Sequence, residues 1–429
     1  MNFNLLARRN LLRNRRRSLV TILSIAFGVA AVAIFAGYTK AMYLGLRNMA
    51  VHGELLGQLS INKTGWYTEG KLHPNRFVLS EADLSRIADI IHHEFPQAHV
   101  IPRMGLEGLL SNARSSTIFL AYGIAPDDLQ TLLGPLGGVY RGLSADQPNG
   151  VAMADGLGAM LGLAIGSDAA VLVSTINGQA NAADIEVRDR MNTGNTATND
   201  KFMLMPIALT RSLKDIGEGA EWVTVLLDSP KPSKNIDEGI RALFTTRLLD
   251  DAQVEAARSR LKGALDEVGL GVDVHTWRGL SVYYNQVKRL YDIIFTLLLS
   301  IVVGIVVLSI ANAMSMSVVE RTREIGTLRA IGLRRTGVVR LFVTEALLLV
   351  AIGSIVGVIG SVLASWLVTV ADIRYIPPGN SMSVPVYIAF DPVRIALTLV
   401  VLGILSIVAA FFPTRKAAYQ PIIDSLSHA

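Results

Sequence analysis

The sequence predicts an α-helical membrane protein with four transmembrane helices and a large α+β domain outside the membrane. Of its 429 residues, 51% are hydrophobic and only 17% are charged, whereas soluble domains carry about 25% charged residues. Four uncharged apolar runs are each long enough to cross a bilayer, which takes about 20 helical residues. A long segment with alternating helix-like and strand-like patterns separates the first run from the second.

The apolar runs set the expected order of segments along the chain. We predict a cytoplasmic basic N-terminus (1–17), a first span (18–39), an extracytoplasmic domain with stalk helices at both ends (40–292), a second span (293–319), a cytoplasmic loop (320–340), a third span (341–371), an external loop (372–394), a fourth span (395–414) and a cytoplasmic tail (415–429). Four spans place both termini on one side of the membrane.

Basic residues indicate which side this is. They cluster before the first span, between the second and third spans, and after the fourth: Arg8, Arg9, Arg13, Arg15, Arg16, Arg17, Arg321, Arg323, Arg329, Arg334, Arg335, Arg340, Arg415 and Lys416. Loops rich in Lys and Arg stay in the cytoplasm. The segment 40–292 holds 24 Lys and Arg against 29 Asp and Glu, a net charge of −5. The positive charge therefore lies beside the membrane and does not indicate nucleic-acid binding.

The first apolar run has an alternative interpretation as a cleaved signal peptide, because basic residues precede it. The run is longer than the 7–15 residues that are typical of a signal core, and no clear small-x-small cleavage site follows it. We expect it to remain as a transmembrane helix.

The segment 40–292 alternates predicted helices and strands, which indicates an α+β domain in two parts. Strands are predicted at 116–124, 151–154, 169–175 and 222–227, and helices at 80–95, 126–133, 206–216 and 250–268. Residues 177–200 are rich in Asn, Ala, Thr and Gly and predict a mobile loop or a solvated hairpin tip.

Apolar stripes continue past the ends of the first two spans. Phe35, Tyr38, Met42, Leu46 and Met49 follow the first span, and Leu280, Tyr283, Val287, Leu290 and Ile294 precede the second. Their spacing of three and four predicts two helices that pack together as a stalk. The same pattern also fits two amphipathic helices packed on the domain.

Sequence signatures of catalysis and cofactor binding are missing. The run His92-His93-Glu94 has Gln97 where a zinc-peptidase helix needs its second His, and Gly156-Leu-Gly158 lacks the third glycine of a dinucleotide fingerprint. There is no phosphate loop, no G-x-S-x-G elbow and no cysteine. We expect no catalytic, cofactor or metal site in this chain, and the uncharged spans do not predict a hydrophilic conduit.

The third span carries a stripe of small residues at every fourth position, Gly353, Gly357 and Ser361. Such a stripe lets another helix approach closely, so we expect helix packing here. Glu345 stands at the cytoplasmic end of this span, and we expect it to pair with an arginine or to reach the membrane surface.

The segment Glu320–Gly332 is the most specific in the sequence. The pairs Arg321/Glu324 and Glu320/Arg323 have helix-surface spacing, and Ile325, Leu328 and Ile331 are placed to face a hydrophobic groove. A short amphipathic helix at the membrane surface is typical of a docking element.

This segment, followed by Leu341-Phe342 and Glu345–Leu349, resembles the permease subunits of the MacB/FtsX/LolE type, the mechanotransmission class of ABC transporters. The ending, with Pro413, Arg415, Lys416, Pro421 and Leu426, is similar to the C-terminal motif of that family. The layout of one span, a large domain and three spans resembles the family over the whole chain, and is closest to the lipoprotein-releasing LolC/LolE relatives.

The resemblance implies a domain of the MacB periplasmic type in the bacterial inner membrane, and a coupling helix that docks on a separate ATPase holding ATP and Mg²⁺. The coupling residues it implies are Glu320, Arg321, Arg323, Glu324, Gly326, Leu328 and Arg329. It also implies a second permease copy or paralogue and a periplasmic carrier or adaptor. We expect the chain to be a non-catalytic subunit that extracts or expels an amphiphilic cargo, such as a lipoprotein.

Other functions remain open. An FtsX-like permease would signal to an extracytoplasmic partner enzyme, a MacB-like permease would export its substrate with a periplasmic adaptor, and a membrane-anchored enzyme is a third class. Gene neighbourhood would separate a transport system, encoded beside a carrier or adaptor, from a signalling system, encoded beside a hydrolase.

Overall fold

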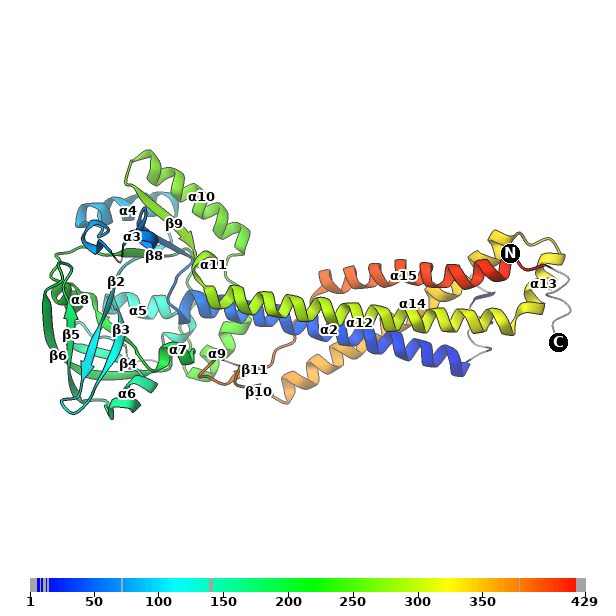
Figure 1. The fold of residues 1–429 in the computed structure, drawn as a ribbon, viewed down its shortest axis with the longest axis horizontal. Coiled ribbons are helices and arrows are strands. Elements are labelled where there is room, and N and C mark those ends of the chain that lie inside the picture. Colours follow the sequence, from blue (N-terminus) through cyan, green and yellow to red (C-terminus); the bar gives the residue numbers. More distant parts are fainter. Residues whose placement is uncertain are drawn as a thin grey trace. The chain divides into compact units, whose positions relative to one another are not determined.

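Four long helices contain the four predicted spans (Figure 1). They are α2 (Arg15–Asn48), α12 (Val282–Glu320), α14 (Arg335–Val370) and α15 (Pro392–Ala418), and each is long and apolar enough to cross a membrane. This computed structural model describes residues 6–7, 9–10, 13, 15–70, 72–138, 142–377 and 379–421, so Arg8 and Leu426, named above, lie outside the described residues. Contacts divide the chain into a membrane-helix unit (Met1–Ala41, Lys288–Ile373 and Val386–Ala429) and a barrel unit (Met42–Val287 and Arg374–Pro385).

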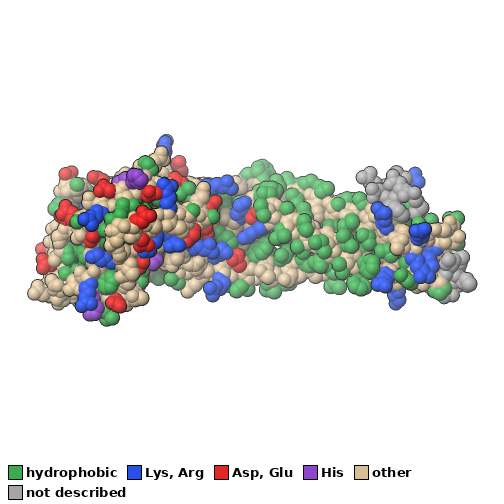
Figure 2. Space-filling view, turned by 90° about the horizontal axis from the view of Figure 1, so that it is seen from above, with side chains coloured by type: hydrophobic (Ala, Val, Ile, Leu, Met, Phe, Trp, Pro, Cys, Tyr) green, Lys and Arg blue, Asp and Glu red, His purple; other side chains and the backbone are tan. Residues whose placement is uncertain are grey.

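The membrane-helix unit has an apolar core to which all four long helices contribute. Ile25, Ile310, Phe342 and Leu402 each come from a different helix, and each is at most 1% exposed. Hydrophobic side chains also cover the outside of these helices in a broad band, and Lys and Arg gather at the end of the band (Figure 2). A helix bundle that is apolar both inside and outside is typical of a membrane-spanning domain.

The stripe of small residues brings α14 close to α2. A Cβ atom on Gly353 would lie 2.7 Å from Cγ2 of Ile25, and one on Gly357 would lie 2.6 Å from the carbonyl oxygen of Ala26. Ser361, one turn further along, is only 5% exposed. Larger residues at the two glycines would push these helices apart.

Six strands of the barrel unit close into a barrel. They are β2 (His99–Ser111), β3 (Ser116–Ile124), β4 (Gly150–Ala154), β5 (Asp168–Ser174), β6 (Ala180–Met191) and β7 (Phe202–Pro206), paired in the order β2-β3-β7-β4-β6-β5-β2. Their side chains alternate between a buried interior and the outer wall, as in β5, where Val171 and Val173 point inward. Gly108 allows β2 to approach β5, because a Cβ atom there would lie 2.3 Å from the carbonyl oxygen of Leu172.

An open four-stranded wing extends from the first half of β2. It has the order β2-β8-β1-β9, with β1 (Leu59–Lys63), β8 (Trp222–Leu226) and β9 (Val272–Thr276). The helices α4 (Glu81–Glu94) and α10 (Asp251–Glu267) pack on it and are joined by the Arg260–Glu94 ion pair. Ser80 caps α4 in a capping box with Asp83, which agrees with the predicted start of that helix.

Shorter helices connect these strands. They are η1 (Met49–Gly53), α3 (Trp66–Glu69), η2 (Pro74–Arg76), α5 (Pro126–Leu133), η3 (Gly134–Leu136), α6 (Asp155–Leu161), α7 (Thr196–Asn199), α8 (Ile207–Lys214), α9 (Ile236–Thr245) and α11 (Trp277–Leu280). A small hairpin of β10 (Arg374–Tyr375) and β11 (Val384–Pro385), from the predicted external loop, also belongs to the barrel unit.

The predicted mobile loop at 177–200 was wrong. Half of this segment is β6, whose Ile185, Val187 and Met191 are buried in the barrel. The exposed turn at 177–179, which joins β5 to β6, fits the alternative of a solvated hairpin tip. The inward positions of β6 include the small or polar residues Asn181 and Ala183, which pair in register with the inward-pointing Val173 and Val171. Because few of the inward positions carry large apolar residues, the composition resembled that of a loop.

The barrel generates a prediction that compares two adjacent residues. Phe119 is fully buried in β3, whereas its neighbour Ile118 is 64% exposed. We expect Phe119→Ala to lower the free energy of unfolding of the barrel unit by ~3–5 kcal/mol, because it leaves a cavity, and Ile118→Ala to change it by less than ~0.5 kcal/mol. Denaturation of the full chain, followed by tryptophan fluorescence, measures both. Equal effects would contradict the assigned register of β3.

Candidate coupling site

The loop between α12 and α14 folds into a short helix with a sharp turn on each side. Arg321 interrupts helical geometry between α12 and α13 (Thr322–Ala330), with φ −114° and ψ 18°. Gly332 ends the segment with φ +100°, a backbone conformation that favours glycine. The predicted amphipathic helix is therefore a separate element and does not extend either long helix.

An ion-pair network holds the start of α13 against α14. Arg321 Nε lies 2.6 Å from Glu324 Oε2, and its Nη1 lies 3.3 Å from Glu345 Oε2. The guanidinium also stands over the ring of Phe342, 5.4 Å from its centroid. The side chains of Arg321 and Glu345 are only 11% and 7% exposed. Removing the charge of Arg321 would leave the buried Glu345 carboxylate without this ion pair, which is costly.

Further contacts hold α13 and the adjacent end of α12 against residues near the start and the end of the chain. Arg13 approaches Glu324 of α13 at 3.8 Å, and Arg17 of α2 pairs at 3.2 Å with Glu320, the last residue of α12. Arg329 donates to the carbonyl oxygen of Gln420. The short helix is thus tied to residues before the first span and after the fourth.

One face of α13 and the following turn points into solvent. Arg323, Thr327 and Ala330 are exposed at helical spacing, and Ile331 beside them is 78% exposed. An exposed isoleucine flanked by an arginine is a suitable contact for a partner surface.

The structure therefore separates the seven predicted coupling residues into groups. Arg323 and Glu320 are both exposed, and Glu320 lies beside Arg17. Arg321, Glu324, Leu328 and Arg329 are half-buried, and Gly326 is buried. Ile325, expected to face a partner's groove, is 4% exposed and packs inside the unit. The sequence reasoning missed Thr327 and Ala330, although their spacing from Arg323 places them on the same helix face.

The helices α2 and α12 contact each other within the membrane-helix unit, near its boundary with the barrel unit. The hydroxyls of Tyr38 and Tyr291 are 3.3 Å apart, and the rings of Phe35 and Phe295 stack with centroids 6.1 Å apart. On α2 the contact residues belong to the predicted stripe. On α12 they are Tyr291 and Phe295, each one residue beyond the predicted positions Leu290 and Ile294, which are exposed.

Inside the barrel unit, the end of α2 is fixed by side chains that bond to backbone carbonyls. Asn48 donates to the carbonyls of Leu243 and Thr246 at 2.6 and 2.9 Å. The helix then widens into the π-turn η1, where the buried His52 donates from Nδ1 to the carbonyl of Leu132 at 2.8 Å. Burial lowers the pKa of His52 to about 4, so this histidine is neutral at physiological pH.

Arg103 stabilises the turn that follows η1. Leu55 has a positive φ of 61°, which is strained for a residue with a side chain, and Arg103 donates from Nη1 to its carbonyl oxygen. This arginine is 1% exposed, and its guanidinium lies over the rings of Tyr122 and Trp222, at 4.6 and 5.5 Å from their centroids. One buried cation thus links the end of the stalk helix to β2, β3 and β8.

The β10–β11 hairpin is bound to the barrel unit by contacts of several kinds. Arg374 pairs with Asp237 at 2.9 Å, and Met382 and Val384 pack against Ile240 of α9. Backbone bonds join Thr196 N to Gly379 O at 3.0 Å and Ser381 N to Gly194 O at 3.2 Å. The polar residues 192–196, whose composition predicted a mobile loop, thus form a binding site for this hairpin.

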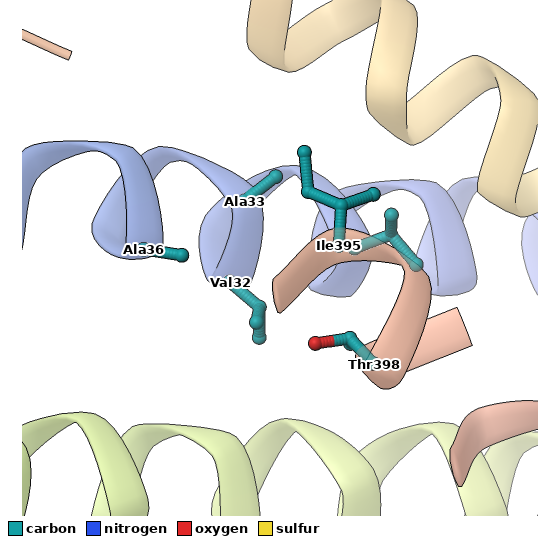
Figure 3. A pocket seen from close by; sticks show the side chains of 6 residues that line it. Val32, Ala33, Ala36, Ile395 and Thr398 are labelled. Atoms are coloured by element: carbon teal, nitrogen blue, oxygen red, sulfur yellow. The ribbon is translucent and has the colours of Figure 1, made fainter. Parts of the chain in front are cut away.

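A narrow crevice lies between α2 and α15 (Figure 3). Its lining is apolar except for Thr398, whose hydroxyl donates to the carbonyl of Arg394 at 2.8 Å. All six lining residues (Val29, Val32, Ala33, Ala36, Ile395 and Thr398) are at most 8% exposed. The crevice is a packing seam and offers no polar group to a solute. Within the described residues, no cluster of three or more His, Asp or Glu could hold a metal ion.

Comparison with known proteins identifies the part of the chain that holds α13. Residues 296–422 match the family described as FtsX-like permease C-terminal. The macrolide export ATP-binding/permease protein MacB of Escherichia coli K12 is 30% identical over 159 residues, which are 36% of this chain and 22% of MacB. MacB of Chromobacterium violaceum is 28% identical over 186 residues, which are 43% of this chain and 27% of that protein.

The chain thus spans less than a third of the length of these relatives. The matches confirm the resemblance to permeases of the MacB/FtsX/LolE type. The closer likeness to LolC/LolE stays a prediction.

The network around Arg321 predicts different effects for two nearby arginines. We expect Arg321→Glu to lower the stability of the membrane-helix unit by roughly 3–5 kcal/mol, because Glu345 then faces a like charge in a buried position. Arg323→Glu should leave stability unchanged, because that side chain is exposed. Thermal unfolding of the purified chain in nanodiscs measures both, and the exchange Arg321→Glu/Glu345→Arg should recover part of the loss. Equal stability of the two single variants would show that the Arg321 pair has no structural role.

The buried His52 predicts a pH dependence. The unfolded chain binds a proton at this residue near pH 6.5, whereas the folded chain does so only near pH 4. Stability should therefore fall as the pH decreases from 6.5 to 4, by roughly 3 kcal/mol for a pKa lowered this far. Urea denaturation of the full chain at several pH values measures the trend. The variant His52→Gln keeps a hydrogen-bond donor for the carbonyl of Leu132, and its free energy of unfolding should depend less on pH. An equally steep pH dependence in this variant would exclude His52 as the cause.

Proposed function

We propose that this chain, whose residues 296–422 match the FtsX-like permease C-terminal family, couples ATP hydrolysis by a separate ATPase to movement of its barrel unit. The observation that carries the proposal is the solvent-facing surface of α13, formed by Arg323, Thr327, Ala330 and Ile331. This surface lies on a helix that is braced from behind by ion pairs. The chain itself is a non-catalytic subunit in this proposal, and ATP and Mg²⁺ bind the partner.

In the first step, a movement of the ATPase displaces α13 and, with it, the long helices. Contact at Arg323 and Ile331 displaces α13, and the Arg321–Glu345 pair resists its separation from α14. The Arg17–Glu320 pair holds the adjacent end of α12 against α2. Buried and half-buried ion pairs with defined geometry hold their partners in one arrangement, so α13 moves together with these helices. The predicted residues Arg321 and Glu324 thus act in coupling as braces, and Arg323 acts as a contact.

The second step is transmission along α12 and α2. The helix α12 has 39 residues without a break, which is ~58 Å at ~1.5 Å per residue. It reaches from the loop at Glu320 to Val282 in the barrel unit, and α2 ends in the same unit at the carbonyl contacts of Asn48. A movement of the membrane-helix unit therefore reaches the barrel unit through two continuous helices.

The cargo we propose is an amphiphile, such as a lipoprotein or a lipid-like molecule, extracted or expelled on the outer side of the membrane. The crevice between α2 and α15 has no polar group free to bind a solute, and the core of the membrane-helix unit is apolar. A hydrophilic substrate would need polar side chains along its path. A cargo taken from the outer leaflet needs no path through the membrane.

The positions of the arginines support an orientation with both termini and α13 in the cytoplasm, and the barrel unit in the periplasm. The remaining partners are a second permease copy or a paralogue, membrane lipids, and a periplasmic carrier or adaptor. Export of a small molecule is the main alternative, because the relatives are named macrolide exporters. FtsX-like signalling to an extracytoplasmic enzyme would use the same coupling surface.

Two variants separate the proposed steps. The sequence Gly-Gly-Ser-Gly inserted between Val287 and Lys288 interrupts α12, so we expect cargo release to fall to the level without ATP while the partner ATPase is still stimulated. Arg323→Glu should lower both ATPase stimulation and release. The chain is reconstituted with its ATPase in liposomes, and both activities are measured; the isolated chain should hydrolyse no ATP.

The matched control carries the same insertion after Gly178, in the exposed turn between β5 and β6, and should behave as the unmodified chain. Undiminished release with α12 interrupted would rule out transmission through the stalk helices. ATP hydrolysis by the homogeneous isolated chain would rule out the need for a partner.

A further inference from the structure

The outer wall of the barrel carries a continuous row of apolar side chains. Leu109 of β2 pairs in register with Ile118 of β3 on one side and with Leu172 of β5 on the other, and Leu172 pairs with Ala182 of β6. Directly paired residues in antiparallel strands point to the same face. Four neighbouring strands therefore place one apolar residue each on a single line across the wall.

These side chains face solvent. Ile118, Leu172 and Leu109 are 64%, 48% and 44% exposed, whereas their neighbours along the strands, such as Phe119, Leu110 and Val171, are fully buried in the barrel. Single exposed apolar residues are common on protein surfaces, but a contiguous group in register on a rigid sheet is characteristic of an interaction site. Because the barrel is closed, this wall has no free strand edge, and a partner contacts it through side chains.

Carboxylates flank the row on both sides. Glu107 lies two residues from Leu109 on β2, and Asp184 lies two residues from Ala182 on β6. Both are exposed, and neither forms an ion pair among the residues that the structure describes. The complementary surface has apolar side chains between Lys or Arg. A second copy of this wall does not fit, because it would bring the same carboxylates together, and the segment 40–292 has a net charge of −5.

We propose that the row Ile118–Leu109–Leu172–Ala182 docks a second protein, whose contact surface presents apolar side chains flanked by basic ones. This goes beyond the coupling function, because it does not depend on the ATPase or on the cargo. The apolar row supplies the area that leaves water on docking, and the two carboxylates set the orientation of the partner and exclude acidic surfaces.

The test is photo-crosslinking of the full chain in the cells that produce it. A benzophenone amino acid replaces Leu109, or Leu172 in a second chain, and the adduct is analysed by mass spectrometry. We expect one protein adduct from both positions, with Lys or Arg beside the crosslinked residue of the partner. The adduct should be lost in the Glu107→Lys/Asp184→Lys background. The benzophenone at Ser85, an exposed position on α4, should not give it.

Four results would overturn the proposal: no adduct, an adduct that persists after charge reversal, an adduct with a second copy of this chain, or an adduct with a lipid. The thermal unfolding midpoint of each variant is measured first. If the double lysine variant does not fold, Glu107→Gln/Asp184→Asn removes the charges with less perturbation. Loss of the adduct in that variant would then support the proposal, and its persistence would overturn it.

Discussion

Every peptide group that crosses a bilayer must find its hydrogen-bond partner within the protein, and a helix satisfies this requirement along its own length. In α2 and α12 the helical bonding does not stop at the boundary of the membrane-helix unit. The two helices continue into the barrel unit, where Asn48 and His52 bond to backbone carbonyls. The same helices that satisfy their backbone hydrogen bonds within lipid therefore also connect the two units.

The sequence predicted the helical part of this molecule better than the barrel. Uncharged apolar runs identify spans without knowledge of their neighbours, and the helix predicted at 80–95 corresponds to α4, whose start is fixed locally by the capping box of Ser80 and Asp83. The strand β2 was missed because Pro102, Arg103, Gly105 and Gly108 interrupt its alternation. Closure of the barrel depends on the pairing of β2 with β5, which are far apart in the chain. No local pattern contains that information.

The coupling loop shows the same limit at the level of side chains. Spacing predicted a helix with Arg321, Arg323 and Glu324 on its surface; Arg323 and Glu324 are on such a helix, and Arg321 is its N-cap residue. Which of them turn inward depends on Glu345 and Phe342, which belong to the next helix, and on Arg17, which precedes the first span. A pattern within one element cannot reveal partners from other elements. It therefore could not separate Arg321 and Glu324, which form ion pairs inside the unit, from Arg323, which faces solvent.

Closure of the barrel has a consequence for how such a protein can diverge. Each strand gives one set of side chains to the interior and another to the outer wall, and the wall has no edge to protect. The outward residues are then nearly independent of folding, since their replacement leaves the interior packing of Phe119 and Val171 intact. Descendants of one ancestral chain could therefore acquire different binding specificities by drift at a few wall positions, while the helices and the barrel interior remain under selection for stability.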